Sequence, residues 1–292
     1  MRLVTYAGSQ GRRAGILQDG QVFDLELASG GSEVNALPSD LGAVLAKGEP
    51  AWKQLRELAE SEILPTISHK IGEVRLLAPL QHAGKIIGVA RNYWDWLAQA
   101  NQSVPLEPTL FAKLPNTVVG PGDPVRLPRC AQQVTYEAEV AVVIGRPGRD
   151  ILASRAMAHV AGYTIINDVT ASDVIRRDGN SFRGKNFDTF APMGPWLTSA
   201  DEISAPHGLS IRLKKNGKLL QNSSTTQMVM GIPELISYIS RAITLNPGDI
   251  IATGTPGGTA VFHAPPAYLA AGDDIEITIE GLGVLCNPVT SE

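Results

Sequence analysis

The chain has 292 residues and a formal net charge of −4, from 25 basic and 29 acidic residues spread along the sequence. This length can bury a sizeable core, in one large domain or in one domain with a small appendage. Because no basic stripe is present to hold a phosphate backbone, nucleic acid is not expected as a partner. No window approaches the roughly 18 apolar residues of a membrane span, and the N-terminus lacks the apolar run of a signal peptide. We therefore expect a cytoplasmic protein without membrane contact, in which Cys130 and Cys286 are reduced.

The first part of the sequence predicts a small N-terminal unit. Residues 1–30 alternate short apolar runs with turn-like segments, a pattern typical of strands. From Leu41 to Ala59 the apolar residues recur at helical spacing, and Pro65 lies beyond them. We therefore expect a small N-terminal α/β domain over residues 1–78 and a catalytic domain over residues 79–292.

The rest of the chain is dominated by strand and turn patterns. Apolar runs such as KIIGVA, VTYEAEVAVVIG, AGYTIIND and GDDIEITIEGLGVL are separated by Gly or Pro. Helical patterns are fewer, the best being SRAMAHVA and IPELISYISRAI, the second with Pro233 near its start. The sequence predicts a mixed α+β, mostly β fold without a regular βαβ alternation.

Two carboxylates share one side of a predicted strand. In VTYEAEVAVVIG, residues two apart face the same way, so Glu137 and Glu139 project together while Tyr136, Ala138 and Val140 face the other side. Like charges this close disfavour joint ionisation, and a hard divalent cation can stabilise both. A strand with a solvated acidic face is the simpler alternative.

A third oxygen ligand is available at the end of the next apolar run. AGYTIIND ends in Asn167 and Asp168, which places a carboxylate at a strand terminus. A set of three carboxylates with no His or Cys favours Mg²⁺ or Mn²⁺, or Ca²⁺ in a crystal, over zinc. The alternative is that Asp168 is only a helix cap or a turn residue.

Cations and a tight turn follow farther along the chain. The loop-like stretch RRDGNSFRGKNFDTF carries Arg183 for bidentate carboxylate recognition and Lys185 as a point charge for a developing enolate, although a solvated basic loop would look the same. GDIIATGTPGG lacks the ending of a phosphate-binding loop, so nucleotide binding is disfavoured. As a strand running into a turn, it presents the Thr255 hydroxyl and backbone N–H groups to an oxyanion, or it is a structural turn.

Taken together, the segments resemble the fumarylacetoacetate hydrolase superfamily. IIGVARNY, TYEAEVAVVIG, AGYTIINDVTASD, FRGKNFDTFAPMGPWL, KKNGKLLQ, LNPGDIIATGTPGG and LAAGDDIEITIEGLGVLCNPV follow in family order over roughly residues 83–289. The first ~75 residues resemble the variable N-terminal unit of the shorter bacterial members.

The resemblance implies a fold, a cofactor and site residues. The fold is a rolled or coiled β-sheet, usually in a homodimer, with Mg²⁺ or Mn²⁺ held by Glu137, Glu139 and Asp168. Lys185 stabilises a substrate enolate and Thr255 contacts a substrate carboxylate or carbonyl. We also expect substrate contacts from residues in or beside the matching blocks: Arg91, Tyr93, Trp96, Arg183 and Gly254.

The sequence departs from the family pattern in the first block. Members commonly continue Asn-Tyr as N-Y-x-x-H-x-x-E, where the His-Glu pair activates water, but here Trp96 and Gln99 occupy those two positions. An indole N–H cannot accept a proton and a neutral amide cannot orient an imidazolium, so the usual pair is absent. His263 is our first candidate for a replacement base and Asp95 the second.

These features lead to three hypotheses about function. The leading one is a Mg²⁺- or Mn²⁺-dependent hydrolase or lyase that cleaves a carbon–carbon bond in a small 2-oxo or 2,4-dioxo acid through a metal-stabilised enolate. The alternative is a tautomerase, isomerase or decarboxylase of an oxo-acid, which needs no attacking water. The third is a metal-dependent binder without catalysis. Trp94 and Trp96 are expected to narrow the pocket.

Overall fold

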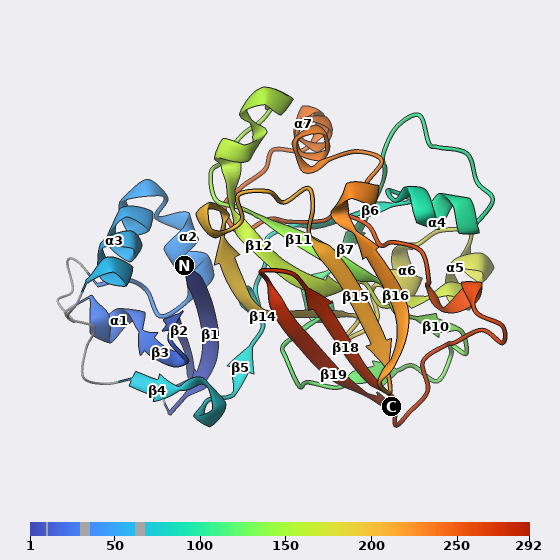
Figure 1. The fold of residues 1–292 in the computed structure, drawn as a ribbon, viewed down its shortest axis with the longest axis horizontal. Helices are drawn as coiled ribbons and strands as arrows, with labels where there is room; N and C mark the ends of the chain where they lie inside the picture. Colours follow the sequence, from blue (N-terminus) through green and yellow to red (C-terminus); the bar gives the residue numbers. More distant parts are fainter. Residues whose placement is uncertain (10, 30–35, 62–67) are drawn as a thin grey trace.

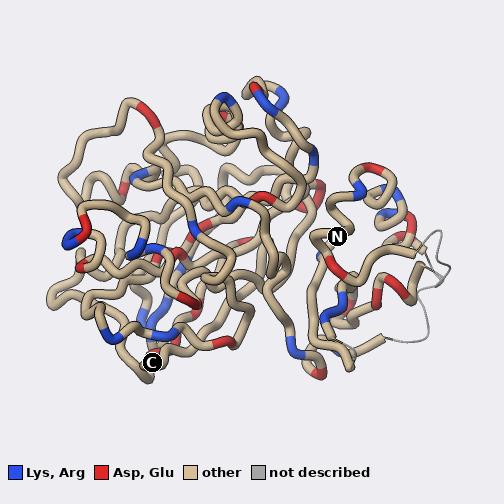
Figure 2. Tube along the Cα trace, turned by 180° about the vertical axis from the view of Figure 1, so that it is seen from behind, with Lys and Arg blue, Asp and Glu red and all other residues tan. Residues whose placement is uncertain are grey.

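The computed structural model describes residues 1–9, 11–29, 36–61 and 68–292. Two large sheets form the body of the molecule, and a smaller unit that contains helices α1, α2 and α3 lies at one side (Figure 1). The mixed α+β, mostly β architecture that the sequence predicts is confirmed. Lys, Arg, Asp and Glu are interspersed along the chain without a long run of one sign (Figure 2).

Within the described residues, the larger sheet has twelve strands, with the main order β4-β3-β2-β1-β14-β12-β11-β17-β6-β7. Two further strands attach to it, β5 to β1 and β8 to β14. Its strands are β1 (Arg2–Gly8), β2 (Gly11–Gln18), β3 (Gln21–Asp24), β4 (Ser68–Lys70), β5 (Leu76–Leu77), β6 (Ile86–Ala90), β7 (Thr109–Lys113), β8 (Val118–Val119), β11 (Ala138–Ile144), β12 (Val160–Asn167), β14 (Ala191–Ser199) and β17 (Ile250–Ala252).

A second sheet packs against the centre of the first, and its described strands follow the order β16-β15-β18-β19-β9 (Figure 1). Its strands are β9 (Val125–Leu127), β15 (Ser210–Lys215), β16 (Lys218–Ser224), β18 (Asp274–Ile279) and β19 (Gly283–Ser291). A short antiparallel pair is formed by β10 (Val134–Thr135) and β13 (Thr170–Ala171).

Helices are short and lie around the sheets (Figure 1). The α-helices are α1 (Leu25–Ala28), α2 (Leu41–Ala46), α3 (Glu49–Glu60), α4 (Trp94–Gln99), α5 (Ser172–Asp178), α6 (Phe182–Lys185) and α7 (Ile232–Ala242). The 3-10 helices are η1 (Ile71–Glu73), η2 (Pro115–Thr117), η3 (Ala153–His159), η4 (Ala200–Glu202), η5 (Thr225–Gln227) and η6 (Ala260–Phe262). None of the helices within the described residues is long and apolar enough to cross a membrane.

Strand β11 is central because both of its faces are buried. Val140 and Val142 belong to the core between the two sheets, while Ala141 and Val143 belong to a second core shared with helices α2 and α3. Both faces of a strand enclosed in this way must be apolar, which explains the nearly continuous run AVVI.

The large sheet rolls back on itself. Lys113, at the end of the last strand β7, donates a hydrogen bond to Asp168 beyond the end of β12, although three strands separate β7 from β12 in the sheet order. A flat sheet would keep these strands far apart, because neighbouring strands are ~5 Å apart. The rolled sheet implied by the family resemblance is therefore present.

Several local predictions need correction. SRAMAHVA forms the 3-10 helix η3 and not an α-helix. The predicted helix from Leu41 to Ala59 consists of two helices, α2 and α3, which are separated at Gly48. Gly48 has a positive φ of 67°, which a helix cannot continue through, and Pro50 lies in the first turn of α3. The predicted loop around Lys185 instead contains α5 and α6.

The N-terminal unit shares the large sheet with the body. β1 pairs antiparallel with β14, so that Arg2 lies opposite Thr198 and Leu3 opposite Leu197. The two regions are thus joined by backbone pairing, and the division at residues 78 and 79 stays a prediction. Cys130 and Cys286 are both free and exposed.

Candidate metal and substrate site

The pairing of β11 with β12 brings the predicted carboxylates together. Ala138 lies opposite Asn167, and the register continues one residue beyond, where the Asp168 N–H donates to the Glu137 carbonyl at 2.9 Å. Asn167 strengthens the same end, because its Oδ1 accepts from the Glu137 N–H at 2.9 Å. Glu137 and Asp168 are therefore cross-strand neighbours, and Glu139 is the next residue on the same side of β11.

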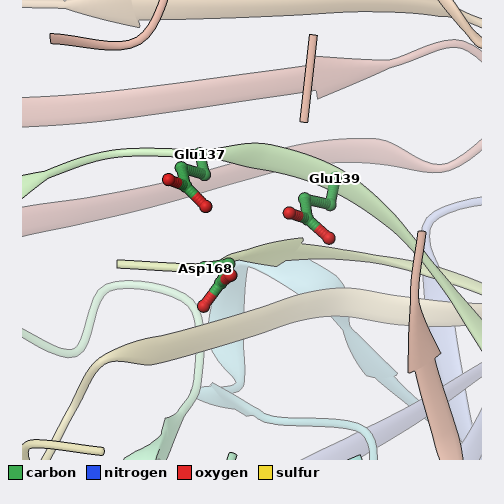
Figure 3. A group of neighbouring side chains, drawn as sticks. All are labelled: Glu137, Glu139 and Asp168. Atoms are coloured by element: carbon green, nitrogen blue, oxygen red, sulfur yellow. The ribbon is translucent and has the colours of Figure 1, made fainter. Parts of the chain in front are cut away.

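The three carboxylates converge on one point. Oxygen atoms of Glu137, Glu139 and Asp168 all lie within 4.8 Å of one another. Figure 3 shows the two glutamates projecting from one side of their strand toward the segment that carries Asp168. Glu139 and Asp168 are buried and Glu137 is partly buried. The solvated acidic face that was the alternative for this strand is thus not what the structure has.

Two lysines enter the carboxylate cluster. Lys185 Nζ contacts Glu137 Oε2 at 2.8 Å and also pairs with Asp168 Oδ2. Lys113 Nζ contacts Asp168 Oδ1 at 2.7 Å and the Lys185 carbonyl at 2.7 Å, and its side chain is fully buried. Asp168 is therefore held between two ammonium groups, whereas Glu139 accepts its one described hydrogen bond from the Gly254 N–H at 2.8 Å.

This arrangement gives the three acids different proton affinities. Burial raises the pKa of Glu137 to about 7, and burial together with the carboxylates of Asp168 and Glu137 raises the pKa of Glu139 well above its ordinary value. Burial also acts to raise the pKa of Asp168, but Lys113 and Lys185 more than offset it, so that this pKa is lowered. Ionising Glu137 and Glu139 in this cluster therefore costs free energy.

The lysines also differ from each other. Burial lowers the pKa of Lys113 below its ordinary value. Burial acts in the same direction on Lys185, but the carboxylates of Asp168 and Glu137 outweigh it and raise the pKa of Lys185. Lys185 is therefore a fixed ammonium group, and it lies 4.5 Å from the centre of the Phe111 ring.

A cavity of about 320 Å³ opens onto the cluster. Seven of the predicted site residues line it, namely Arg91, Trp96, Glu137, Glu139, Asp168, Lys185 and Thr255. Its apolar walls are formed by Val89, Leu110, Phe111 and Ile175. Lys185 and Thr255 thus face the same space as the three carboxylates.

The TGTP turn is hydrogen-bonded to Glu139 and to the backbone of the strand that carries it. Gly254 has a φ of 97°, a conformation that favours glycine, and its N–H is directed at Glu139. Thr255 Oγ1 donates to the Ala138 carbonyl at 3.1 Å and accepts from Gln221 Nε2 at 2.9 Å. Its hydroxyl proton is therefore already used within the protein.

Helix α4 places Trp96 at the cavity and is tied to the same turn. Asp95 Oδ1 accepts from the Gly257 N–H at 3.1 Å, and Gln99 Oε1 accepts from the Gly258 N–H at 2.7 Å. The Trp96 ring packs edge-on against Phe262, with 5.7 Å between ring centres. At the His position of the family motif, Trp96 thus forms part of the cavity wall. At the Glu position, Gln99 accepts a hydrogen bond from the backbone of the TGTPGG turn.

Four other predicted site residues do not line this cavity, and one of them is Gly254, whose N–H is bonded to Glu139. Tyr93 is fully buried in the core. Arg183 is exposed and forms a bidentate pair with Asp178 at 2.6 and 2.7 Å. His263 has its Nε2 2.9 Å from the Gly258 carbonyl oxygen. Their proposed roles at the substrate stay predictions.

Sequence reasoning missed Lys113 and Gln221. Lys113 ends an ordinary strand pattern, and only the roll of the sheet carries it to Asp168. Gln221 is fully buried on β16, where its Oε1 accepts from the Ala138 N–H at 3.0 Å and its Nε2 holds the TGTP turn. In KLLQ, Gln221 follows two leucines on the strand. Strands commonly mix apolar and polar residues in this way, so the pattern does not mark Gln221 as a functional residue.

Comparison with known proteins gives this geometry a family. The sequence matches the family described as fumarylacetoacetate (FAA) hydrolase C-terminal over residues 85–290. The chain belongs to the fumarylacetoacetate hydrolase family. This confirms the resemblance that the order of the sequence blocks indicates, and places the chain in a family that contains tautomerases, isomerases and hydrolases.

Three similar members of the fumarylacetoacetate hydrolase family illustrate its range. The mitochondrial oxaloacetate tautomerase of Xenopus laevis is 43% identical over 275 residues, covering 91% of this chain and 85% of the relative. The fumarylacetoacetate hydrolase of Exiguobacterium antarcticum has a TM-score of 0.85 and 33% identity, with 100% of both chains covered. The 2-hydroxyhepta-2,4-diene-1,7-dioate isomerase of Mycobacterium marinum has a TM-score of 0.77 and 32% identity, covering 100% of this chain and 99% of that one.

The donor set fits a hard divalent cation. Oxygen atoms of the three carboxylates lie within 4.8 Å of one another, and burial next to other carboxylates raises the pKa of Glu137 and of Glu139. A cation between them removes the repulsion that burial creates. In this fumarylacetoacetate hydrolase family member the cluster can therefore hold a metal ion, and oxygen ligands favour Mg²⁺ or Mn²⁺.

Proposed function

We propose that the protein is a keto–enol tautomerase of a small 2-oxo acid, with oxaloacetate as the first substrate to test. The observation that carries the proposal is the side of the cavity formed by helix α4, where an indole stands and the neighbouring amide is tied to the backbone of Gly258. Neither group can take a proton from water. Tautomerisation requires a group that accepts the proton from carbon and a group that donates a proton to oxygen, but it requires no attacking water.

The three carboxylates would hold the Mg²⁺ or Mn²⁺ ion. When bound, a divalent cation polarises the oxygens of an oxo acid and lowers the cost of enolate charge. Lys185 supplies the complementary donor from the protein. Because its pKa is raised, Nζ stays protonated and acts as a hydrogen-bond donor to the oxygen on which negative charge develops, not as a base.

The cavity wall keeps bulk water from the reacting carbon. Trp96, Leu110 and Phe111 present apolar surface to the space beside Lys185. Exclusion of water strengthens the electrostatic effect of the ammonium group and protects the enol from side reactions. Trp96 is fixed in place because Asp95 and Gln99, on either side of it in the helix, are both bonded to the TGTPGG turn.

Relatives support a tautomerase or isomerase over the hydrolase or lyase that leads the sequence-based hypotheses. The Xenopus relative is named an oxaloacetate tautomerase and the Mycobacterium marinum structure an isomerase, while the Exiguobacterium structure is named a hydrolase. We retain carbon–carbon bond cleavage and decarboxylation as outcomes to be measured, and binding without turnover as the third. A cytoplasmic location and a homodimer stay predictions.

The experiment compares two reactions in the same preparation with and without Mg²⁺ or Mn²⁺. Enol-oxaloacetate loss and acetylpyruvate cleavage are both followed in the ultraviolet. We expect metal-dependent tautomerisation of oxaloacetate and little cleavage of acetylpyruvate. Faster cleavage than tautomerisation by the wild type would overturn the proposal, and ligand stabilisation without turnover in either assay would support the binder instead.

Two variants test the proton path directly. Trp96→His combined with Gln99→Glu restores the family pair and is expected to raise acetylpyruvate cleavage, because an imidazole can then accept a proton from water. His263→Ala is expected to leave tautomerisation within about twofold, since general acid–base groups contribute about 100-fold or more when they act. A large loss on His263→Ala would make His263 the missing base.

A further inference from the structure

Strand β7 contacts Lys185 at both the backbone and the side chain of the lysine. Phe111 and Lys113 lie two positions apart on β7, so their side chains project from the same face of the strand. Lys113 Nζ donates to the Lys185 carbonyl at 2.7 Å, and Lys185 Nζ lies 4.5 Å from the centre of the Phe111 ring. One contact holds the backbone of Lys185, and the other is made to its ammonium group.

The Phe111 ring occupies a space that only glycine leaves open. Gly88 on β6 lies directly opposite Phe111, and cross-strand partners project from the same face of a sheet. A Cβ atom on Gly88 would lie 2.1 Å from Phe111 Cζ, 2.3 Å from Cε2 and 2.7 Å from Cε1, far inside van der Waals contact. The φ of Gly88 is not positive, so the close approach of the ring and not backbone freedom accounts for the glycine.

The ammonium group of Lys185 has three N–H donors. One contacts Glu137 Oε2 at 2.8 Å and another is bonded to Asp168 Oδ2, which leaves one for a substrate oxygen. Both carboxylates belong to the set that fits a divalent cation, and a bound cation draws on the same oxygens. The face of an aromatic ring attracts an ammonium group without those oxygens. The Phe111 ring is therefore a restraint on Lys185 Nζ for which a metal ion does not compete.

Exclusion of water does not by itself require a ring at this position. Val89, Leu110 and Ile175 line the same cavity with aliphatic side chains, and such a wall depends on volume. The attraction between a cation and a ring depends instead on the electron density of the ring face. The two roles therefore respond differently when the electrons of the ring are changed at nearly constant size.

We propose that Phe111 is a positioning residue whose ring face holds the Lys185 ammonium group toward the substrate oxygen, and that Gly88 fixes the place of the ring. The inference rests on the proposed function for the identity of the reaction, but not for the contact between the ring and Lys185. Its consequence is that affinity for an enolate oxygen depends on the electron density of a hydrocarbon ring.

Modified phenylalanines at position 111 test the electronic role. Each variant is loaded with Mg²⁺ and titrated calorimetrically with oxalate, a non-reacting analogue of the enolate of a 2-oxo acid. Phe111→Leu should weaken oxalate binding about 5- to 30-fold, the range of a desolvated cation–π contact. One, two and three fluorine atoms withdraw electrons from the ring and should weaken binding in successive steps toward the value for leucine.

A size control separates ring electrons from packing. The methyl group of para-methylphenylalanine is larger than fluorine but donates electrons, so this variant should bind oxalate within about twofold of the wild type. Phe23→Leu removes a ring from β3 in the N-terminal unit and should have no effect on oxalate binding. Equal losses for the methylated and trifluorinated rings, or no effect of the fluorine series, would mean that Phe111 is only a wall and overturn the inference.

Gly88→Ala tests how the ring is held in place. The added methyl group should displace the ring and weaken oxalate binding about as much as Phe111→Leu. In the Phe111→Leu background the same change should cost less than about twofold, because the two residues act through one contact. Gly15→Ala is the matched control, since a Cβ atom there would lie 2.8 Å from Val22 Cγ1 on a strand of the N-terminal unit. Fully additive losses would overturn the assignment of Gly88.

Kinetics distinguish this inference from the proposed function. If the protein is a tautomerase, the fluorine series should lower kcat for oxaloacetate in the same steps and change KM less than about twofold, because Lys185 acts on the charge that develops in the transition state. A wild type without tautomerisation whose oxalate affinity follows the ring electrons would refute the reaction and retain the positioning role. Tautomerisation with neither kcat nor oxalate affinity dependent on the ring would do the reverse. A wild type that neither binds oxalate nor turns over oxaloacetate would overturn both.

Discussion

The molecule buries charged clusters in two regions, and they are satisfied to different degrees. In the N-terminal unit, Asp24 accepts from Tyr6 Oη at 2.7 Å, from Arg13 Nε and Nη2 at 2.7 and 2.6 Å, and from the Leu27 N–H at 3.1 Å. In the body, Glu139 accepts one hydrogen bond from the residues that the structure describes, and its donor is the Gly254 N–H. Both carboxylates are almost completely buried.

The pKa values record this difference. Burial acts to raise the pKa of Asp24, but the hydrogen bonds from Arg13 and Tyr6 more than offset it and hold the pKa below its ordinary value. The pKa of Glu139 is raised, because burial and its acidic neighbours are not compensated. A buried acid with complete partners stabilises the fold, whereas one that lacks them is ready to bind a cation. Exchanging each acid for its amide tests this contrast.

Glu139→Gln should have the largest effect on function. Metal affinity is expected to fall by more than about 100-fold, since even the outer-shell partners of metal ligands are worth about 10- to 100-fold. Turnover should fall with it, while the Tm of the metal-free protein holds or rises, because the amide removes repulsion from Glu137 and Asp168. Calorimetric Mg²⁺ titration and thermal unfolding measure both. Glu57→Gln on α3 is the exposed control, and a metal-free Tm that drops sharply would show that Glu139 is structural.

Lys185→Met should reduce turnover by about 100- to 1000-fold, as expected for loss of one donor to a developing oxyanion. Metal affinity should stay the same or increase, because the ammonium group no longer occupies Glu137 and Asp168. The measurements are kcat with oxaloacetate and the Kd for Mg²⁺, with exposed Lys53→Met as control. Loss of metal binding together with turnover would contradict an assignment of Lys185 to the substrate.

Asp24→Asn should lower the free energy of unfolding by about 2 kcal/mol, the typical range for hydrogen bonds to a charged group, and leave turnover nearly unchanged. Because the folded pKa of Asp24 is depressed, its stabilisation is fully present above the unfolded pKa of about 3.9 and is lost as the pH falls through the folded pKa. Urea unfolding at pH 7 and at acidic pH should therefore show a shrinking difference from the wild type. Loss of turnover at full folding would link this cluster to the site.

Mg²⁺ binding should tighten as the pH rises toward neutrality. The pKa of Glu137 is about 7 without metal, so below this pH a proton competes with the cation and Kd rises about tenfold per pH unit for each proton displaced. Calorimetry at pH 6.5 in two buffers of different ionisation enthalpy measures the released protons. Identical binding heats in both buffers would mean that the carboxylates are already ionised.

The sequence was sufficient for the parts of the site that follow strand periodicity. Glu137 and Glu139 share a face because residues two apart must, and Asp168 ends the next strand, which pairs with the first. Successive strands usually pair with each other, and the outermost of the three acids, Glu137 and Asp168, are only 31 positions apart. The sequence alone therefore indicates that the three acids lie close together.

The remainder depends on packing between distant strands. Lys113 reaches Asp168 only because the sheet rolls, and the tethers from Asp95 and Gln99 depend on where α4 meets the TGTPGG turn. Arg183 pairs with Asp178, which ends helix α5 five residues earlier. The sequence pattern of this stretch indicates a loop, so this pairing could not be predicted. Side-chain partners of this kind have no periodic signal in the sequence.

The pairing of β1 with β14 has a consequence for synthesis on the ribosome. Arg2 and Leu3 find their backbone partners at Thr198 and Leu197, so this end of the β1 edge stays open until about two-thirds of the chain has been made, whereas Thr5 and Tyr6 pair with β5. An unpaired strand edge is a template for association with other chains, and contacts between distant residues form slowly. The start of β1 must therefore wait for β14, and a chaperone that covers Arg2 and Leu3 during translation would have its greatest effect before residue 198 is made.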